Sequence, residues 1–140
     1  MIHHLDHLVL TTGNEPACVD FYTQVLGMTL LRTTDRPEQQ YTLAFLGYGC
    51  NPEHAEIELT YNYGVAQYEL GTAFGHLAIG VHSVAATCEA ARTKLATLGG
   101  AITREPGPIK GGKTVIAFIA DPDGYKIELI ERPENASELN

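Results

Sequence analysis

Hydrophobic and polar positions alternate with two different periods along this chain, and the order of those periods repeats. Short runs that are apolar at every second residue predict β-strands, and longer stretches with apolar residues three and four apart predict helices. Each half of the chain contains one strand, one helix and then three strands. We therefore expect an α+β fold of two tandem βαβββ modules, with curved mixed sheets that form a cup.

The two modules are expected over about 5–65 and 72–131, inside a single domain of residues 1–140. The elements expected in the first module are strands at 5–11, 28–34, 40–48 and 55–62 and a helix at 15–26. Those expected in the second module are strands at 75–82, 101–105, 113–119 and 125–131 and a helix at 84–98. Loops rich in Pro, Gly and polar residues are expected at 35–40, 47–54 and 105–112. The polar tail, 132–140, is expected to fray.

Each expected helix has a recognisable start and end. Asn14 and Ser83 are residue types whose side chains cap helix N-termini, and each directly precedes a helical pattern. Gly27 follows the first helical pattern and Gly99 the second, as expected where a helix stops. The inward stripes expected on the helices are Ala17, Cys18, Phe21, Tyr22 and Val25, and Val84, Cys88, Ala91, Leu95 and Leu98.

The repeat extends to residues that carry chemistry. His7 and His76 lie 69 residues apart on the first strands of the two halves, and Glu58 and Glu128 lie 70 apart on the last strands. Four matches in corresponding strands favour a duplicated module in which the His and the Glu of each half have a function over a duplicated fold in which they are relics. The two modules therefore predict two equivalent His–Glu pairs.

Strand parity predicts which way these four side chains point. Successive side chains point to opposite faces, so each His or Glu has an aliphatic face opposite to it. Those aliphatic faces carry Leu8 and Leu10, Ile57 and Leu59, Leu77 and Ile79, and Ile127 and Leu129. The aliphatic faces are expected under the helices, which directs the four polar side chains into the cup.

Two imidazoles and two carboxylates that converge form a divalent-metal site. This ligand set suits nickel, cobalt, iron, manganese or zinc. Four protein ligands leave two positions of an octahedral ion for water or substrate, which is an open, catalytic arrangement. His3 and His4 lie near His7 and compete with it as ligands, but only His7 matches His76 in spacing and parity. The histidines interpreted as surface or loop residues are His3, His4, His54 and His82, and the phenylalanines interpreted as core are Phe21, Phe45, Phe74 and Phe118.

Composition excludes some partners. The chain is 44% hydrophobic and 19% charged, as in ordinary globular proteins. Its net charge of −8 argues against nucleic acid or an anionic membrane as a partner. It has no apolar run near the roughly 18 residues of a membrane span and no signal-peptide pattern, and its three cysteines lack metal-type spacing. Reduced thiols and a cytoplasmic location are therefore expected.

Several longer motifs resemble one known family. The segments "FYTQVLGMTLLR", "YTLAFLGYG", "IELTYNYGVAQYELGTAFGHLAIGV" and "TREPGPIKGGKTVIAFIADPDGYKIELIE" are similar to glyoxalase I (lactoylglutathione lyase), of the vicinal oxygen chelate superfamily, and the resemblance covers about 5–131. It implies the vicinal oxygen chelate (glyoxalase) fold, with one divalent metal per site, held by His7, Glu58, His76 and Glu128. It favours nickel or cobalt, with zinc possible, and implies a homodimer whose sites are shared between subunits.

The resemblance also implies a reaction. The glyoxalase reaction isomerises the hemithioacetal of methylglyoxal and glutathione to S-D-lactoylglutathione through an enediolate that the metal stabilises. Glu128 is the implied proton-shuttling base, and Glu58 is its counterpart for the other face of the substrate. Asn62 and Lys110 are the implied substrate contacts. Thr11 stands where the family commonly has a glutathione-binding Arg, so the identity of the thiol is open.

Two other classes of function share the fold. One is a different metal-dependent enzyme of the superfamily, such as an epimerase, a thiol transferase or a ring-cleaving dioxygenase. Ring cleavage uses two His and one carboxylate, so a fourth ligand argues against it. The other is a non-catalytic drug-binding dimer, against which the complete ligand quartet argues.

Overall fold

The computed structural model describes residues 1–132 and divides into two compact units, Met1–Glu69 and a second that begins at Leu70. The first contains β1 (His7–Thr11), α1 (Glu15–Asp20) with a following π-helical turn (Phe21–Val25), β2 (Thr29–Arg36), β3 (Tyr41–Gly47) and β4 (Glu56–Asn62). The second contains β5 (Leu77–Val81), α2 (Val84–Leu98), β6 (Ala101–Pro108), β7 (Val115–Ala120) and β8 (Lys126–Glu131). Apart from Arg132, the tail expected to fray lies outside the described residues.

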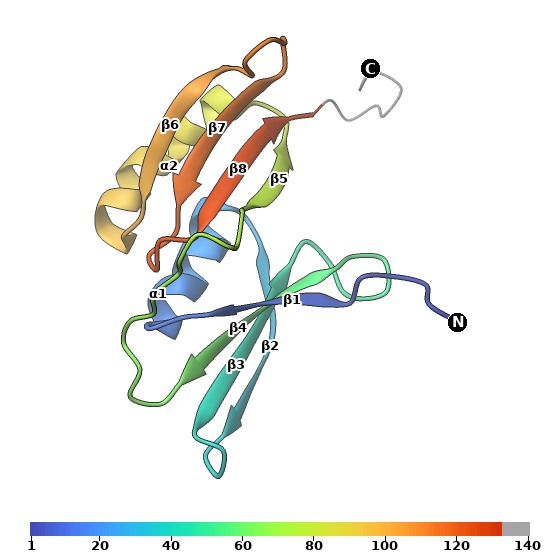
Figure 1. Ribbon diagram of the computed structural model, residues 1–140, viewed down its shortest axis with the longest axis vertical. Helices are drawn as coiled ribbons and strands as arrows, with labels where there is room; N and C mark the ends of the chain where they lie inside the picture. Colours follow the sequence, from blue (N-terminus) through green and yellow to red (C-terminus); the bar gives the residue numbers. More distant parts are fainter. Residues whose placement is uncertain (133–140) are drawn as a thin grey trace. The chain divides into compact units, whose positions relative to one another are not determined.

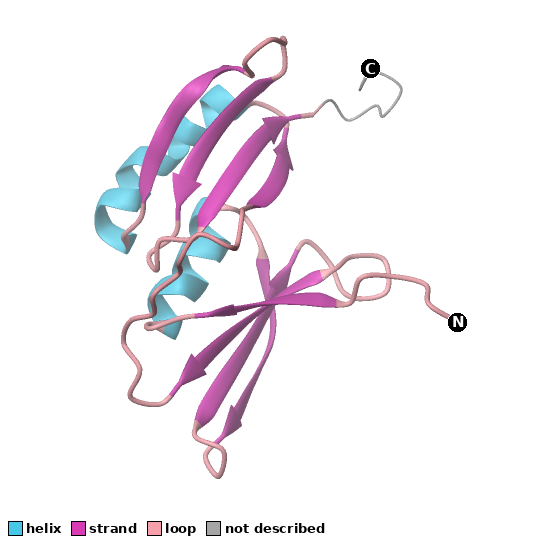
Figure 2. Cartoon of the chain, in the orientation of Figure 1, coloured by secondary structure: helices cyan, strands magenta, loops and turns pink. Residues whose placement is uncertain are grey.

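Both units have the same sheet topology. The strand order is β1-β4-β3-β2 in the first unit and β5-β8-β7-β6 in the second (Figure 1). β1 runs parallel to β4 and β5 runs parallel to β8, while the other neighbouring pairs are antiparallel. Figure 2 shows how small the helical share of each unit is beside its sheet. The α+β class and the two βαβββ modules predicted from the sequence are confirmed.

The helix caps act as the sequence predicts. The Asn14 side chain accepts a hydrogen bond from the backbone N–H of Ala17, and the Ser83 hydroxyl accepts one from that of Ala86, both at 3.1 Å. Gly27 has a φ of 70°, a left-handed conformation that favours glycine and ends the first helical segment. The first helix closes in a π-helical turn, which the periodicity of the sequence did not predict.

The aliphatic strand faces form the core on the helix side of each sheet. Leu59 is 1% exposed in the first unit, where α1 packs against β3 and β4. Ile127 and Leu129 are 0% exposed in the second, where α2 packs against β6, β7 and β8 (Figure 1). Leu8 differs from the expectation, because it is 39% exposed. It lies on β1, an edge strand of its sheet, whereas α1 packs mainly against β3 and β4.

Most strand ends lie within two residues of those predicted, and two of the differences bear on the sheet or the site. β6 continues to Pro108, through residues expected to be loop, and pairs there with β7. The Arg104 guanidinium explains this extension, because it donates to the carbonyl oxygens of Gly107, Ile116 and Pro108 at 2.8–2.9 Å. A proline is tolerated because β6 is an edge strand. The other difference is that β5 begins after His76, which the sequence placed on the strand.

A buried turn positions the strand that carries Glu128. The Asp121 carboxylate, 2% exposed, accepts hydrogen bonds from the backbone N–H groups of Asp123 and Tyr125, both at 2.9 Å. Gly124 adopts a φ of 96° within this turn. The turn directs the chain straight into β8. No helix within residues 1–132 has the length and apolar character that a membrane crossing requires.

Candidate metal and active site

The first candidate half-site is a His–Glu pair on neighbouring parallel strands. Glu58 on β4 lies in register with Val9 of β1, two residues beyond His7. The Nε2 atom of His7 is 3.4 Å from Oε1 of Glu58. The His7 side chain is 35% exposed and that of Glu58 is 14% exposed, so the pair is shielded but accessible.

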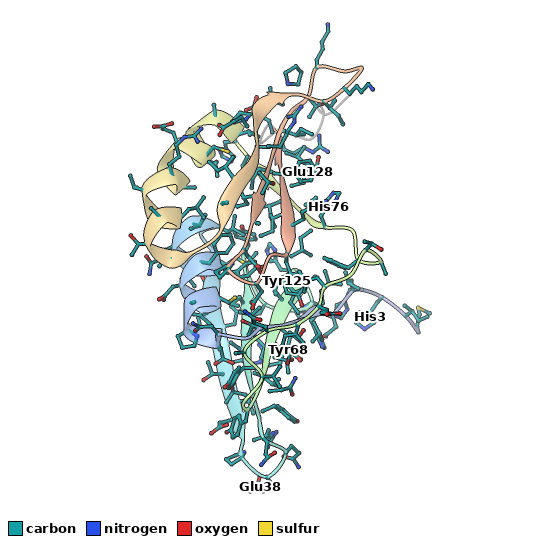
Figure 3. The ribbon with its side chains drawn as sticks, turned by 60° about the vertical axis from the view of Figure 1, so that its left-hand side comes forward. His3, Glu38, Tyr68, His76, Tyr125 and Glu128 are labelled. Carbon is teal, nitrogen blue, oxygen red and sulfur yellow. The ribbon has the colours of Figure 1, made fainter. Side chains whose placement is uncertain are left out.

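The second candidate half-site repeats this arrangement. Glu128 on β8 lies in register with Ala78 of β5, two residues beyond His76. The Nε2 atom of His76 is 2.9 Å from Oε1 of Glu128. Figure 3 shows the two labelled side chains close together on the side of the sheet away from α2. The parity prediction for this pair agrees with that view.

Both pairs also have an aromatic neighbour at the equivalent place. Phe45 of β3 lies in register with Glu58, and Phe118 of β7 lies in register with Glu128. Each phenylalanine presents a ring edge-on to its histidine, with centroids 6.1 Å apart for His7 and 5.2 Å apart for His76. The sequence interpretation of these two phenylalanines as core residues was therefore incomplete, because both are half-buried beside a candidate ligand.

The remaining aromatic and histidine expectations have mixed outcomes. Phe21 is 0% exposed and belongs to the core, as predicted. Phe74 is 47% exposed, so its interpretation as a core residue was wrong; it lies in the segment between β4 and β5 rather than on an element that packs. The four histidines predicted to be surface or loop residues are exposed, and they are His3, His4, His54 and His82.

The chemistry of the donor atoms fits a divalent cation. A carboxylate only accepts hydrogen bonds, so the 2.6 Å contact between His7 Nδ1 and Asp6 Oδ2 requires a proton on Nδ1. The Nε2 atom of a neutral His7 ring then carries a lone pair that faces a carboxylate oxygen of Glu58. Two donor atoms bound at right angles to one ion at about 2.1 Å are about 3 Å apart, close to the separations in both pairs.

Asp6 has a second basic neighbour. His4 Nε2 lies 3.6 Å from Oδ1 of Asp6. The hydrogen bond with His7 is the main reason that the pKa of the Asp6 carboxyl lies below its ordinary value, and His4 lowers it further. Asp6 therefore stays ionised at neutral pH beside the candidate ligand.

Glu56, on the same strand as Glu58, is the buried partner in an ion pair with the half-exposed Arg32. Glu56 is 2% exposed, accepts a hydrogen bond from Arg32 at 2.7 Å and accepts another from the backbone N–H of Asn51 at 3.1 Å. The Arg32 guanidinium also lies 4.2 Å above the centre of the Phe45 ring. The hydrogen bond from Arg32 is the largest cause that holds the pKa of Glu56 below its ordinary value of 4.5.

This ion pair predicts acid sensitivity. The folded protein holds Glu56 ionised more strongly than the unfolded chain does, so the stabilisation is complete above pH 4.5 and is lost as pH falls through the lower, folded pKa. We expect urea unfolding of the metal-free protein to show a smaller decline of stability below pH 4.5 in Glu56→Gln than in the unsubstituted chain. Glu53→Gln, in an exposed turn, is the control. Equal acid dependence of Glu56→Gln and the unsubstituted protein would contradict the assignment.

The residues expected to contact substrate, Thr11, Asn62 and Lys110, lie on β1, on β4 and in an exposed turn. Thr11 lies in register with Thr60, beside the first pair, and the amide of Asn62 donates to the Tyr68 hydroxyl at 2.9 Å. Lys110 lies exposed in the turn between β6 and β7. In the second unit, a hollow of about 290 Å³ is lined by Thr103, Arg104, Phe118 and Lys126.

Sequence reasoning placed two further residues, Lys126 and Thr60, beside the pairs without assigning them a role, and it missed the partners of Asp6 and Glu56. Lys126 stands two residues before Glu128 on the same strand, so parity alone placed it on the same face. The Thr60 hydroxyl donates to Oε2 of Glu58 at 2.9 Å, and the same parity rule placed Thr60 there. The partners of Asp6 and Glu56 depend on contacts across strands or between adjacent side chains, for which the sequence contains no pattern.

Comparison with known proteins defines the class. The family model of the glyoxalase/bleomycin resistance protein/dioxygenase superfamily matches residues 4–129. The chain is 58% identical to the lactoylglutathione lyase of Escherichia coli O157:H7 over 91% of this chain and 92% of that protein. The chain therefore belongs to this superfamily and, within it, to the lactoylglutathione lyase (glyoxalase I) enzymes.

Solved structures agree with this assignment. Glyoxalase I of Zea mays superposes with a TM-score of 0.88 and 48% identity over 94% of this chain, which spans only 46% of the maize chain. The trypanothione-dependent glyoxalase I of Leishmania major gives a TM-score of 0.77 and 40% identity, over 92% of this chain and 86% of that one. The predicted family and enzyme class are confirmed, and the non-catalytic alternative is set aside.

Proposed function

We propose that this chain isomerises the hemithioacetal of methylglyoxal and glutathione to S-D-lactoylglutathione, and so detoxifies methylglyoxal. The observation that carries the proposal is the pair of matched His–Glu contacts, His7 with Glu58 and His76 with Glu128. The similarity of the whole chain to the lyase of Escherichia coli O157:H7 supports the same reaction.

The four paired residues are the proposed ligands of one divalent ion per site, with nickel or cobalt favoured and zinc as the alternative. When bound, such an ion supplies a Lewis acid that stabilises negative charge on the substrate oxygens. The 14% exposure of both carboxylates supports this role, because a shielded site strengthens electrostatic interactions.

Proton transfer is assigned to the carboxylates. In the proposed reaction, Glu128 takes the proton from the carbon that bears sulfur and hydroxyl, and returns it to the neighbouring carbonyl carbon. Glu58 serves the opposite face of the substrate. No other reactant is consumed, because the reaction only relocates protons within the hemithioacetal.

Asn62, Lys110 and Lys126 are proposed to hold the thiol part of the substrate. The two lysines offer cations to its carboxylates, and Lys126 borders the hollow beside Phe118. Thr11 offers no cation for a glutathione carboxylate, so the thiol that the site prefers has to be tested. Glutathione is the first thiol to test, and other thiols are compared with it. The trypanothione dependence of the Leishmania major relative supports such a comparison.

We further propose a homodimer in which each site takes His7 and Glu58 from one subunit and His76 and Glu128 from the other. Two compact units, each with one pair, suit such an exchange. A cytoplasmic location is also proposed; the three cysteines, all within the described residues, form no disulfide, as is usual in a reducing compartment.

The test uses metal-stripped protein with methylglyoxal and glutathione, re-supplied separately with nickel, cobalt and zinc. We expect thioester formation, followed by absorbance, to fall at least about tenfold on stripping and to recover best with nickel or cobalt. The unstripped protein carried through the same buffers is the control. No thioester with any metal would overturn the proposal, whereas activity with another thiol alone would keep the reaction and replace glutathione as substrate.

A further inference from the structure

The two half-sites share their ligands but differ in the residues that support those ligands. By the offset of the repeat, Asp6 in the first unit corresponds to Gly75 in the second, and Thr60 corresponds to Ile130. Gly75 has no carboxylate with which to hold a histidine, and Ile130 has no hydroxyl to donate to a glutamate. The first pair therefore has two polar supports whose equivalents in the second pair are apolar or absent.

Asp6 determines which nitrogen of His7 is free. Its Oδ2 atom lies 2.6 Å from Nδ1, which fixes the proton on that nitrogen and exposes the lone pair of Nε2 toward Glu58. His76 has the opposite arrangement. Its Nε2 atom lies 2.9 Å from the Glu128 carboxylate, so that nitrogen is the donor toward Glu128 and does not offer a lone pair in the metal-free protein.

Thr60 fixes the second ligand of the first pair. Its hydroxyl donates to Oε2 of Glu58 at 2.9 Å and leaves Oε1 directed at His7. Thr60 is itself held on both sides, because its backbone lies in register with Thr11 of β1 and Leu43 of β3. The Glu58 carboxylate is thus restrained through a residue in the middle of the sheet.

We propose that Asp6 and Thr60 are positioning residues that pre-form His7 and Glu58 as the fixed half of the metal centre, whereas His76 and Glu128 reach their binding state only with the metal. This inference rests on the proposed function, because the metal centre is the one proposed for that reaction. Metal affinity and histidine tautomers are measured without substrate, so their outcome does not depend on which reaction the protein catalyses. The inference also gives a physical reason for the roles of the carboxylates: Glu58, held by the Thr60 hydroxyl, keeps its place at the ion, whereas Glu128 contacts His76 but has no hydroxyl donor at the position equivalent to Thr60, and so can move a proton.

The first measurement is the affinity for cobalt or nickel, by titration of metal-free protein. Loss of a carboxylate that orients a metal-binding histidine typically costs about 10–100-fold in metal affinity, which is the decrease we expect for Asp6→Ala. Thr60→Val is expected to lose at least about tenfold, as for one hydrogen bond to a charged group. Asp20→Ala and Thr33→Val, exposed residues away from both pairs, are the matched controls and should bind as the unsubstituted protein does. Thr60→Ser should restore the affinity.

The second measurement is the tautomer of the two histidines, from ¹⁵N chemical shifts of the ring nitrogens in metal-free protein. His7 should carry its proton on Nδ1 and His76 on Nε2, and Asp6→Ala should abolish the preference of His7 alone. Asp6 has an exposed side chain, so this variant is expected to fold. Metal affinities within twofold of the unsubstituted protein for both Asp6→Ala and Thr60→Val, or a proton on Nε2 of His7, would overturn the inference. An inactive but normally metal-binding protein would instead count against the proposed reaction alone.

Discussion

Glu128→Gln is expected to lower kcat by about 10²–10⁴-fold, the usual contribution of a general acid–base group. The substitution preserves the size of the side chain and an oxygen that faces His76, but an amide does not take up a proton. The loss should therefore fall on kcat, while the protein still binds metal. Steady-state kinetics with methylglyoxal and glutathione measure the effect.

A matched control separates the loss of a base from a general effect of replacing a carboxylate. Glu53→Gln makes the same chemical change in an exposed turn and should leave kcat unchanged. Glu58→Gln is the informative comparison, because a restrained ligand should lose metal affinity together with activity. Normal turnover of Glu128→Gln would show that another group carries the proton.

Mixing two inactive variants should restore activity. One variant carries His7→Ala and Glu58→Ala, and the other carries His76→Ala and Glu128→Ala. Each alone has no complete ligand set, whether its sites form within one chain or between two. If sites are shared between subunits, a mixed dimer contains one site with all four ligands and one with none.

Co-expression of the two variants in equal amounts should give about a quarter of the unsubstituted specific activity, because half of randomly paired dimers are mixed and each has one intact site of two. Each variant expressed alone is the control and should be inactive. A mixture that forms dimers yet remains inactive would place all four ligands of a site in one chain, and would refute the proposed sharing.

Much of this fold follows from local patterns. Asn14 and Ser83 cap the helices because a side-chain oxygen satisfies a free N–H at each start, a rule that needs no tertiary information. Strand parity placed the aliphatic residues of β4 and β8 in the core and put each glutamate on the other face. The repeat then paired each glutamate with a histidine, at a distance that only the structure measures.

Contacts between strands were less predictable. Strand parity puts Glu56 on the same face as Glu58, yet only the pairing of β2 with β3, and of β3 with β4, brings Arg32 to Glu56 and makes its burial tolerable. The extension of β6 depends likewise on where the Arg104 guanidinium finds carbonyl oxygens. A long charged side chain can reach several hydrogen-bond partners, and the spacing of residues in the sequence does not predict which of them it contacts.

The sequence by itself determined the duplicated βαβββ architecture, the starts of the helices and the matched His and Glu positions. Periodicity and capping depend on a few neighbouring residues, and the repeat is visible from the residue types alone. The tertiary structure decided how each pair is supported. Asp6 and Thr60 hold the first pair through contacts of 2.6 and 2.9 Å, and the second pair has a glycine and an isoleucine at those positions. Two half-sites with the same ligands differ for that reason, since the orientation of a ligand depends on the neighbours that hydrogen-bond to it.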